Sequence, residues 1–137
     1  MRKNIALTAL LLMFIFSISA VANAAVLSSE YIQEVRADTT VNSQGTVNVS
    51  FRIIGTNIMD VLGAKTIIVQ EQAPGSSQWT AVATYNFSSY PSMLRNNTSV
   101  HSSSVSYSGA KSGYSYRAKV YFYAEKGGYD TLEYIAD

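Results

Sequence analysis

The chain contains no cysteine, two prolines and one histidine among its 137 residues, and charged side chains make up only 14% of it. Without cysteine it can form neither disulfides nor thiolate metal sites, so its apolar core must hold the fold together. A single histidine excludes His-rich metal centres and leaves one imidazole as a candidate base. Ten basic and nine acidic residues give no electrostatic reason to expect nucleic acid or an anionic membrane as a partner.

The N-terminus has the pattern of a secretory signal peptide. Arg2 and Lys3 precede an apolar run that ends near residue 20, and Ala-Asn-Ala at 22–24 has the small-x-small form that signal peptidase cleaves. The run is shorter than the ~20 residues of a transmembrane helix. We therefore predict a signal peptide over 1–24, a secreted single domain over 25–137, and no membrane span after cleavage. Removal of the signal peptide takes away Arg2 and Lys3, so residues 25–137 have a formal charge of −1.

In the remaining chain, apolar and polar residues alternate in short stretches that are separated by turn residues. The clearest stretch is 114–124, which lies between the turn residue Gly113 and the pair Gly127-Gly128; its even-numbered residues from Tyr116 to Ala124 would face a core. No helical period occurs beyond the signal peptide. The pattern predicts an all-β, seven-stranded antiparallel sandwich with strands over 31–40, 46–54, 64–72, 79–85, 98–107, 114–124 and 129–135.

Within this plan we expect Phe51 to be the bulkiest core residue of its strand, residues 55–63 to form a loop, and 86–97 to form a longer connection that folds over one end of the core. The triplet 67–69 cannot lie on one face. Either Ile67 and Val69 point inward or Ile68 does, and we prefer the first because it buries two β-branched residues.

The segment from Gly109 to Tyr116, followed by the alternating strand and the turn Gly127-Gly128, resembles the corner, sixth strand and last turn of fibronectin type III domains. Ala110 and Ser112 stand where that family carries leucine and proline. The resemblance implies an immunoglobulin-like sandwich in which Tyr116 forms a tyrosine corner, donating its hydroxyl to backbone near residues 109–111. The whole mature chain also resembles small uncharacterised secreted proteins of Gram-positive bacteria, which implies a location and a fold but no activity.

The sequence carries no constellation that is typical of an enzyme. His101 and Ser103 share a strand face, but side chains at that spacing are about 7 Å apart, and nothing resembles a nucleophile elbow. Carboxylates are scattered, and no glycine loop is of the phosphate-binding kind. We predict no catalytic residues, no cofactor and no metal. We interpret His101 as a surface residue and Trp79 as a residue that packs in the core or at its rim.

The side of strand 114–124 that faces away from the core carries the candidate partner site. Two cations and two tyrosines alternate there, and tyrosine suits contact surfaces because it offers large apolar area and a hydroxyl. The alternative is cross-strand packing that needs no partner. The predicted contact residues are Ile68, Arg117, Lys119, Tyr121 and Tyr123.

These features favour a secreted, non-catalytic binding module that contacts protein or glycan through a sheet face or through loops at one end. The alternative is a structural or assembly subunit that associates with itself through edge strands, with the Ser-rich strand 98–107 or the N-terminal strand as the donor. The sequence leaves the identity of the ligand and the oligomeric state open.

Overall fold

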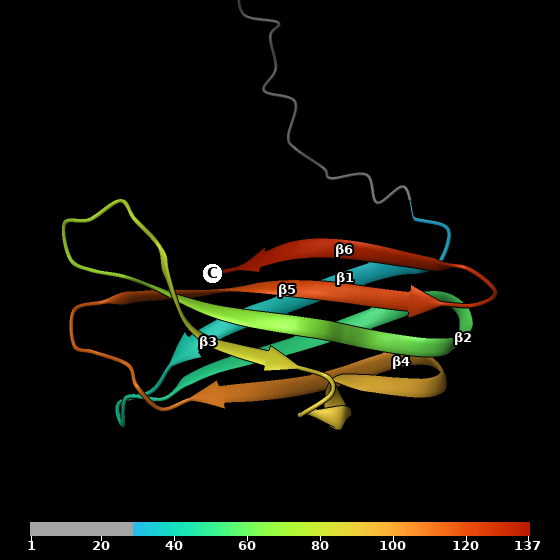
Figure 1. Ribbon diagram of the computed structural model, residues 1–137, viewed down its shortest axis with the longest axis horizontal. Helices are drawn as coiled ribbons and strands as arrows, with labels where there is room; N and C mark the ends of the chain where they lie inside the picture. Colours follow the sequence, from blue (N-terminus) through green and yellow to red (C-terminus); the bar gives the residue numbers. More distant parts are fainter. Residues whose placement is uncertain (1–28) are drawn as a thin grey trace, which may run out of the picture.

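The structure, a computed structural model, describes residues 29–137 (Figure 1). The predicted signal peptide and its cleavage site after Ala24 lie outside these residues. The described chain is all-β, as predicted, and its strands pair antiparallel. Its elements are β1 (Ile32–Val41), β2 (Val47–Gln72), β3 (Thr80–Asn86), the short 3-10 helix η1 (Pro91–Met93), β4 (Leu94–Tyr107), β5 (Ser115–Glu125) and β6 (Tyr129–Ala136).

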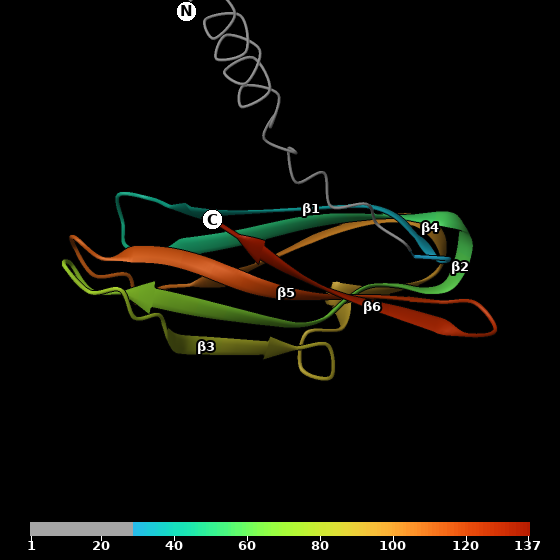
Figure 2. The same cartoon turned by 90° about the horizontal axis from the view of Figure 1, so that it is seen from above.

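The sheet is built around β2. The first part of this strand pairs with β1 and β4, and the last part pairs with β3 and β5. β6 extends the sheet by pairing with β5. Figures 1 and 2 show that β2 runs along the molecule, bends at one end and returns, so that the two parts of the curled sheet face each other.

We expected residues 55–63 to form a loop, and this expectation is wrong because β2 continues through them. The bend has partners on two other strands: Gly63 lies opposite Leu94 of β4 and opposite Tyr123 of β5. A Cβ at Gly63 would lie 2.1 Å from the carbonyl oxygen of Met93, so this close approach requires glycine. Two of the expected strands are therefore one, and the described chain has six strands rather than seven.

The core lies between the two facing parts of the sheet. Phe51 of β2 meets Phe122 of β5 edge to face, with ring centroids 5.8 Å apart, which confirms the predicted core position of Phe51. All the residues of β5 that were predicted to face inward are buried. Ile67 and Val69 are fully buried while Ile68 is half-buried, so the preferred orientation of the triplet is confirmed.

The connection between β3 and β4 folds over one end of the core, as predicted, and buries Met93 completely. It is shorter than the predicted 86–97, because β4 already begins at Leu94. His101 of β4, which we expected at the surface, is buried too. Its Nε2 lies 2.7 Å from the carbonyl oxygen of Ser92, and its ring meets Phe51 edge to face at 6.0 Å between centroids. The expectation failed because residues of this connection cover the inward side of β4.

Hydrogen bonds from side chains tie the two parts of the sheet together along both open sides. The hydroxyl of Tyr85 in β3 donates to the carbonyl oxygen of Ser106 in β4 at 2.7 Å. On the other side, Thr39 of β1 donates to the carbonyl oxygen of Ala136 in β6 at 2.8 Å. β3 and β4 form no ladder with each other, nor do β1 and β6, so these bonds connect edges that strand pairing leaves unconnected.

Candidate functional site

One outer side of the sheet, which we call the aromatic face, is formed by β3, the last part of β2, β5 and β6. Strand pairing places Tyr121 between Thr66 and Glu133. The next row places Lys119 between Ile68 and Ile135. The structure thus brings all the predicted contact residues onto one face, which carries Lys65, Ile68, Trp79, Phe87, Arg117, Lys119, Tyr121, Tyr123 and Tyr129.

A cluster of three aromatic rings and one lysine lies at the end of this face near the bend of β2. Tyr123 stacks on Tyr129 with ring centroids 5.8 Å apart and 28° between the ring planes. The Nζ of Lys65 lies 3.7 Å from the ring centroid of Tyr123 and 5.9 Å from that of Phe87. Tyr129 is 66% exposed and Phe87 41% exposed, so two of the rings are open to solvent.

The exposure that we expected for Tyr123 is wrong, because this side chain is only 7% exposed. It does lie on the outer face, but Lys65 and Tyr129 cover its ring, and its hydroxyl donates a hydrogen bond to Glu125. Sequence analysis missed Lys65 because it occupies an irregular position in the pairing of β2 with β5. Phe87 was missed because it follows the end of β3, where alternation gives no signal.

At the other end of the aromatic face, Arg117 of β5 contacts Gln70 of β2 and Trp79, which directly precedes β3. Its guanidinium lies 4.3 Å from the ring centroid of Trp79, and its Nε donates to Gln70 at 2.8 Å. Trp79 is half-buried by this contact on the outer face and is not part of the core cluster. Lys119 lies 4.0 Å from Glu133. Both predicted cations therefore have partners within the face, and Tyr121 beside them is half-buried.

Two tyrosine hydroxyls of this face, those of Tyr121 and Tyr123, have a pKa raised above the usual value and stay protonated at neutral pH. The hydrogen bond to Glu125, together with burial, raises the pKa of Tyr123 to about 12. Burial and the nearby Glu133 carboxylate raise the pKa of Tyr121. Protonated hydroxyls can both donate and accept hydrogen bonds, so the face offers hydrogen-bonding groups beside its rings.

Tyr116 is the second residue of β5 and lies where the chain enters this strand from the connection after β4. Its hydroxyl contacts the backbone of Lys111, but the direction of the bond is reversed: the N–H of Lys111 donates to the hydroxyl at 2.7 Å. The hydroxyl in turn donates to Glu71 at 3.2 Å, and Glu71 pairs with the ammonium of Lys111 at 3.1 Å. Burial and the bond to Glu71 raise the pKa of Tyr116.

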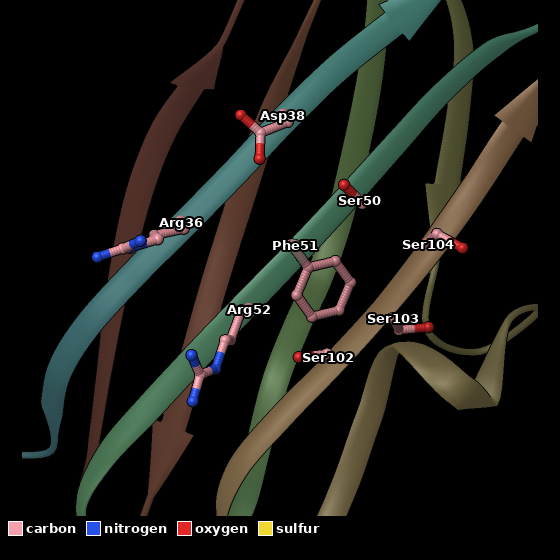
Figure 3. A pocket seen from close by; sticks show the side chains of 8 residues that line it. All are labelled: Arg36, Asp38, Ser50, Phe51, Arg52, Ser102, Ser103 and Ser104. Atoms are coloured by element: carbon pink, nitrogen blue, oxygen red, sulfur yellow. The ribbon is translucent and has the colours of Figure 1, made fainter.

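The opposite outer side, which we call the serine face, is formed by β1, the first part of β2 and β4. It is hollowed by a shallow depression of about 510 Å³ (Figure 3). Arg36 and Arg52 lie directly opposite each other on neighbouring strands, and Arg36 pairs with Glu34 at 2.7 Å. Sequence analysis did not mark this depression, because its outward residues follow ordinary alternation. The face carries Arg36, Asp38, Ser50, Arg52, Ser102 and Ser104.

Within residues 29–137, no group of three His, Cys, Asp or Glu side chains is placed to hold a metal ion. The Nε2 of His101 lies against the Ser92 carbonyl, and the imidazole is buried rather than exposed on either outer surface. Ser103, two residues after His101, is half-buried and also lines the serine-face depression. The exposed serines of β4, Ser102, Ser104 and Ser106, alternate with it. No helix in the part of the chain that the structure describes is long and apolar enough to cross a membrane.

No protein-family model matches the chain, and searches of curated proteins and of solved structures give no significant match.

Proposed function

We propose that this chain is a secreted, non-catalytic binding module whose aromatic face holds a glycan. The observation that carries the proposal is the pair of exposed rings, Phe87 and Tyr129, that flank the packed Lys65–Tyr123 contact. Sugar rings present flat C–H surfaces that pack on aromatic rings and hydroxyls that bond to polar groups around them. A face that alternates rings with hydroxyl, carboxylate and ammonium groups suits such a ligand.

The distribution of charge favours a glycan over a protein as the partner. The centres of protein interfaces are depleted of charged residues. Here Lys119 and Glu133 lie in the middle of the face, and Lys65 lies among the rings. These charges remain partly hydrated, which is compatible with a hydroxyl-rich ligand and unfavourable for burial beneath a flat protein surface.

We also propose that the fold is an immunoglobulin-like sandwich of the fibronectin type III kind. If the two parts of β2 are counted as two strands, the pairing segments number seven and divide into three and four, as the strands of seven-stranded sandwiches do. The contact between the Tyr116 hydroxyl and the backbone of Lys111 supports a tyrosine corner. In this fold family, exposed faces and loops commonly serve recognition.

The test is retention of the secreted protein on a panel of insoluble polysaccharides: cellulose, chitin, xylan and peptidoglycan. We expect at least one of them to retain the parent chain, and Tyr129→Ala to reduce that retention at least about tenfold, because stacking on an exposed ring is lost. Val41→Ala is the matched control, since Val41 is 50% exposed but lies at the end of β1, away from the aromatic face.

Tyr129→Ala should keep the fold and lower the free energy of unfolding by only about 0.5–1.5 kcal/mol, because it loses the stack on Tyr123 but no buried core contact. If no polysaccharide retains the parent, or if Tyr129→Ala and Val41→Ala are retained equally, the proposal fails. A protein partner is the remaining interpretation of the face in that case, and the search would move to immobilised proteins from the same surroundings.

A further inference from the structure

The edges of the curled sheet differ in their protection against pairing with another strand. Proteins protect edge strands with charges, prolines, irregular pairing or short length. β1 carries Glu34, Arg36 and Asp38 and an irregular pairing, β6 carries charged residues, and β3 is only seven residues long. β4 has fourteen residues, and from Asn96 to Tyr107 it contains no charge and no proline. It is the least protected edge.

Two local contacts show which backbone groups of β4 point away from β2. In an antiparallel ladder the N–H and C=O of one residue point to the same side, and successive residues alternate. The carbonyl of Ser106 accepts from Tyr85 across the open side, so the even-numbered residues point outward. Val100 agrees with this assignment, because its N–H donates to the hydroxyl of Thr98 at 3.3 Å and its carbonyl accepts from the same hydroxyl at 2.8 Å.

These contacts also limit the open segment. Thr98 occupies both outward groups of Val100, and Tyr85 occupies one lone pair of the Ser106 carbonyl. Between them, within residues 29–137, the outward groups of Ser102 and Ser104 and the N–H of Ser106 have no protein partner, and all three side chains are exposed. A run of unpaired donors and acceptors of this kind is a template for one more strand.

We propose that this segment, Ser102–Ser106, pairs antiparallel with the same segment of a second copy of the chain, with Ser104 on the two-fold axis. Ser104 then lies opposite its own copy, and Ser102 lies opposite Ser106 of the other copy. A second copy fits because every cross-strand pair joins serines or other small uncharged residues, whereas an edge with charges would place like charges close together at many registers. The outward donors and acceptors match pair by pair.

This association is independent of the proposed glycan site. β4 belongs to the half of the sheet that carries the serine face, so pairing through β4 leaves the aromatic face of both copies open. The new sheet would run continuously through β1, β2 and β4 of each copy, and it would bring the two serine-face depressions toward the axis. Failure of glycan binding would therefore leave this proposal standing, and the reverse also holds.

Because the chain has no cysteine, single thiols can test the register directly. Cα atoms of a hydrogen-bonded antiparallel pair lie about 5.5 Å apart, which is within the distance that a disulfide spans. Ser104→Cys would meet its own copy at that distance, whereas Ser102→Cys would lie about 14 Å from its own copy. Ser50→Cys is a second control, because Ser50 is exposed opposite Ser104 but lies on the central strand.

We expect the full secreted chain with Ser104→Cys to form disulfide-linked dimers in oxidised glutathione at least about tenfold faster than either control. In sedimentation of the cysteine-free protein, dimers should increase with concentration, and Ser104→Lys should weaken them at least about tenfold while Ser50→Lys leaves them unchanged. Equal cross-linking rates, a parent chain that stays monomeric at all concentrations, or an unchanged dimer in Ser104→Lys would each overturn the proposal.

Discussion

The two outer faces of the sheet share a strand and a core but differ in almost every outward side chain. The first part of β2 contributes Ser50 and Arg52 to the serine face, and its last part contributes Thr66 and Ile68 to the aromatic face. The inward residues of both parts are similarly apolar and buried. The inward residues of both parts therefore build one common core. The outward residues determine which kinds of ligand each face can contact.

The faces also differ in how their side chains are held. On the aromatic face, Lys65, Arg117 and Lys119 each lie against a ring or a carboxylate. On the serine face, Arg36 and Arg52 oppose each other, and among the described residues only Arg36 has a carboxylate partner. Side chains that are already held by partners lose little further conformational entropy when a ligand binds. The aromatic face is therefore better preorganised for ligand binding than the serine face.

The largest effect should come from removing the core that both faces share. Phe51→Ala deletes a ring that contacts His101 and Phe122 beneath the serine face. We expect a loss of about 3–5 kcal/mol in the free energy of unfolding, because the transfer energy of the ring and a cavity add together. Urea denaturation measures it. A loss below about 1 kcal/mol would mean that the two parts of the sheet are not held together at this point.

Two tyrosines of the aromatic face should differ in their contribution to stability. Tyr123→Ser removes a ring that Lys65 and Tyr129 cover, and we expect it to cost about 2–4 kcal/mol. Tyr121 is only half-buried, so Tyr121→Ser should cost about 1 kcal/mol. Thermal unfolding of the two variants side by side measures the difference. Equal costs would show that the cluster around Tyr123 does not act as a packed unit.

A smaller effect is expected at the corner that joins the two parts of the sheet. Tyr116→Phe leaves the N–H of Lys111 without its acceptor and Glu71 without one donor. The free energy of unfolding should fall by about 1–3 kcal/mol with the fold unchanged. Denaturation midpoints and circular dichroism together check this. An unchanged midpoint would contradict a structural role for the hydroxyl.

The smallest effect should be a change in acid sensitivity where β6 meets the start of β1. Ser29 donates to Asp130 at 2.5 Å and the N–H of Tyr31 at 3.1 Å, and these bonds hold the pKa of Asp130 below its usual 3.8. A lowered folded-state pKa stabilises the protein above pH 3.8, and this stabilisation is lost as pH falls through the folded-state value. Asp130→Asn should therefore lower the melting temperature at pH 7, and the gap to the parent should close in strong acid. A gap that does not depend on pH would argue against this linkage.

Much of the aromatic face could be predicted from the sequence, because a period of two in β5 and the β-branched pair Ile67 and Val69 determine which side chains point outward. The packing of that face could not be predicted. Tyr123 is covered by Lys65, from an irregular position of β2, and by Tyr129, from the next strand, and neither contact leaves a trace in the alternation of β5.

Long-range pairing explains the other differences. Gly55, Asp60 and Gly63 are typical of a loop, yet the bend of β2 is extended because β4 and β5 supply it with partners. His101 is typical of a polar edge, yet the chain before β4 folds over it and its ring nitrogen reaches the Ser92 carbonyl. In both places a tertiary contact outweighs the local preference of the residue.

The central claim is that the aromatic face binds a glycan and the serine face does not. Amide NMR spectra of the full chain, titrated with cellohexaose, chitohexaose and xylohexaose, compare the two faces in one experiment. We predict that at least one of these oligosaccharides shifts the amide signals of Lys65, Tyr121 and Tyr129 in a saturable way, while those of Arg52 and Ser104 stay in place. Shifts confined to Arg52 and Ser104 would contradict the account, and so would the absence of any saturable shift when cellulose, chitin or xylan retains the chain.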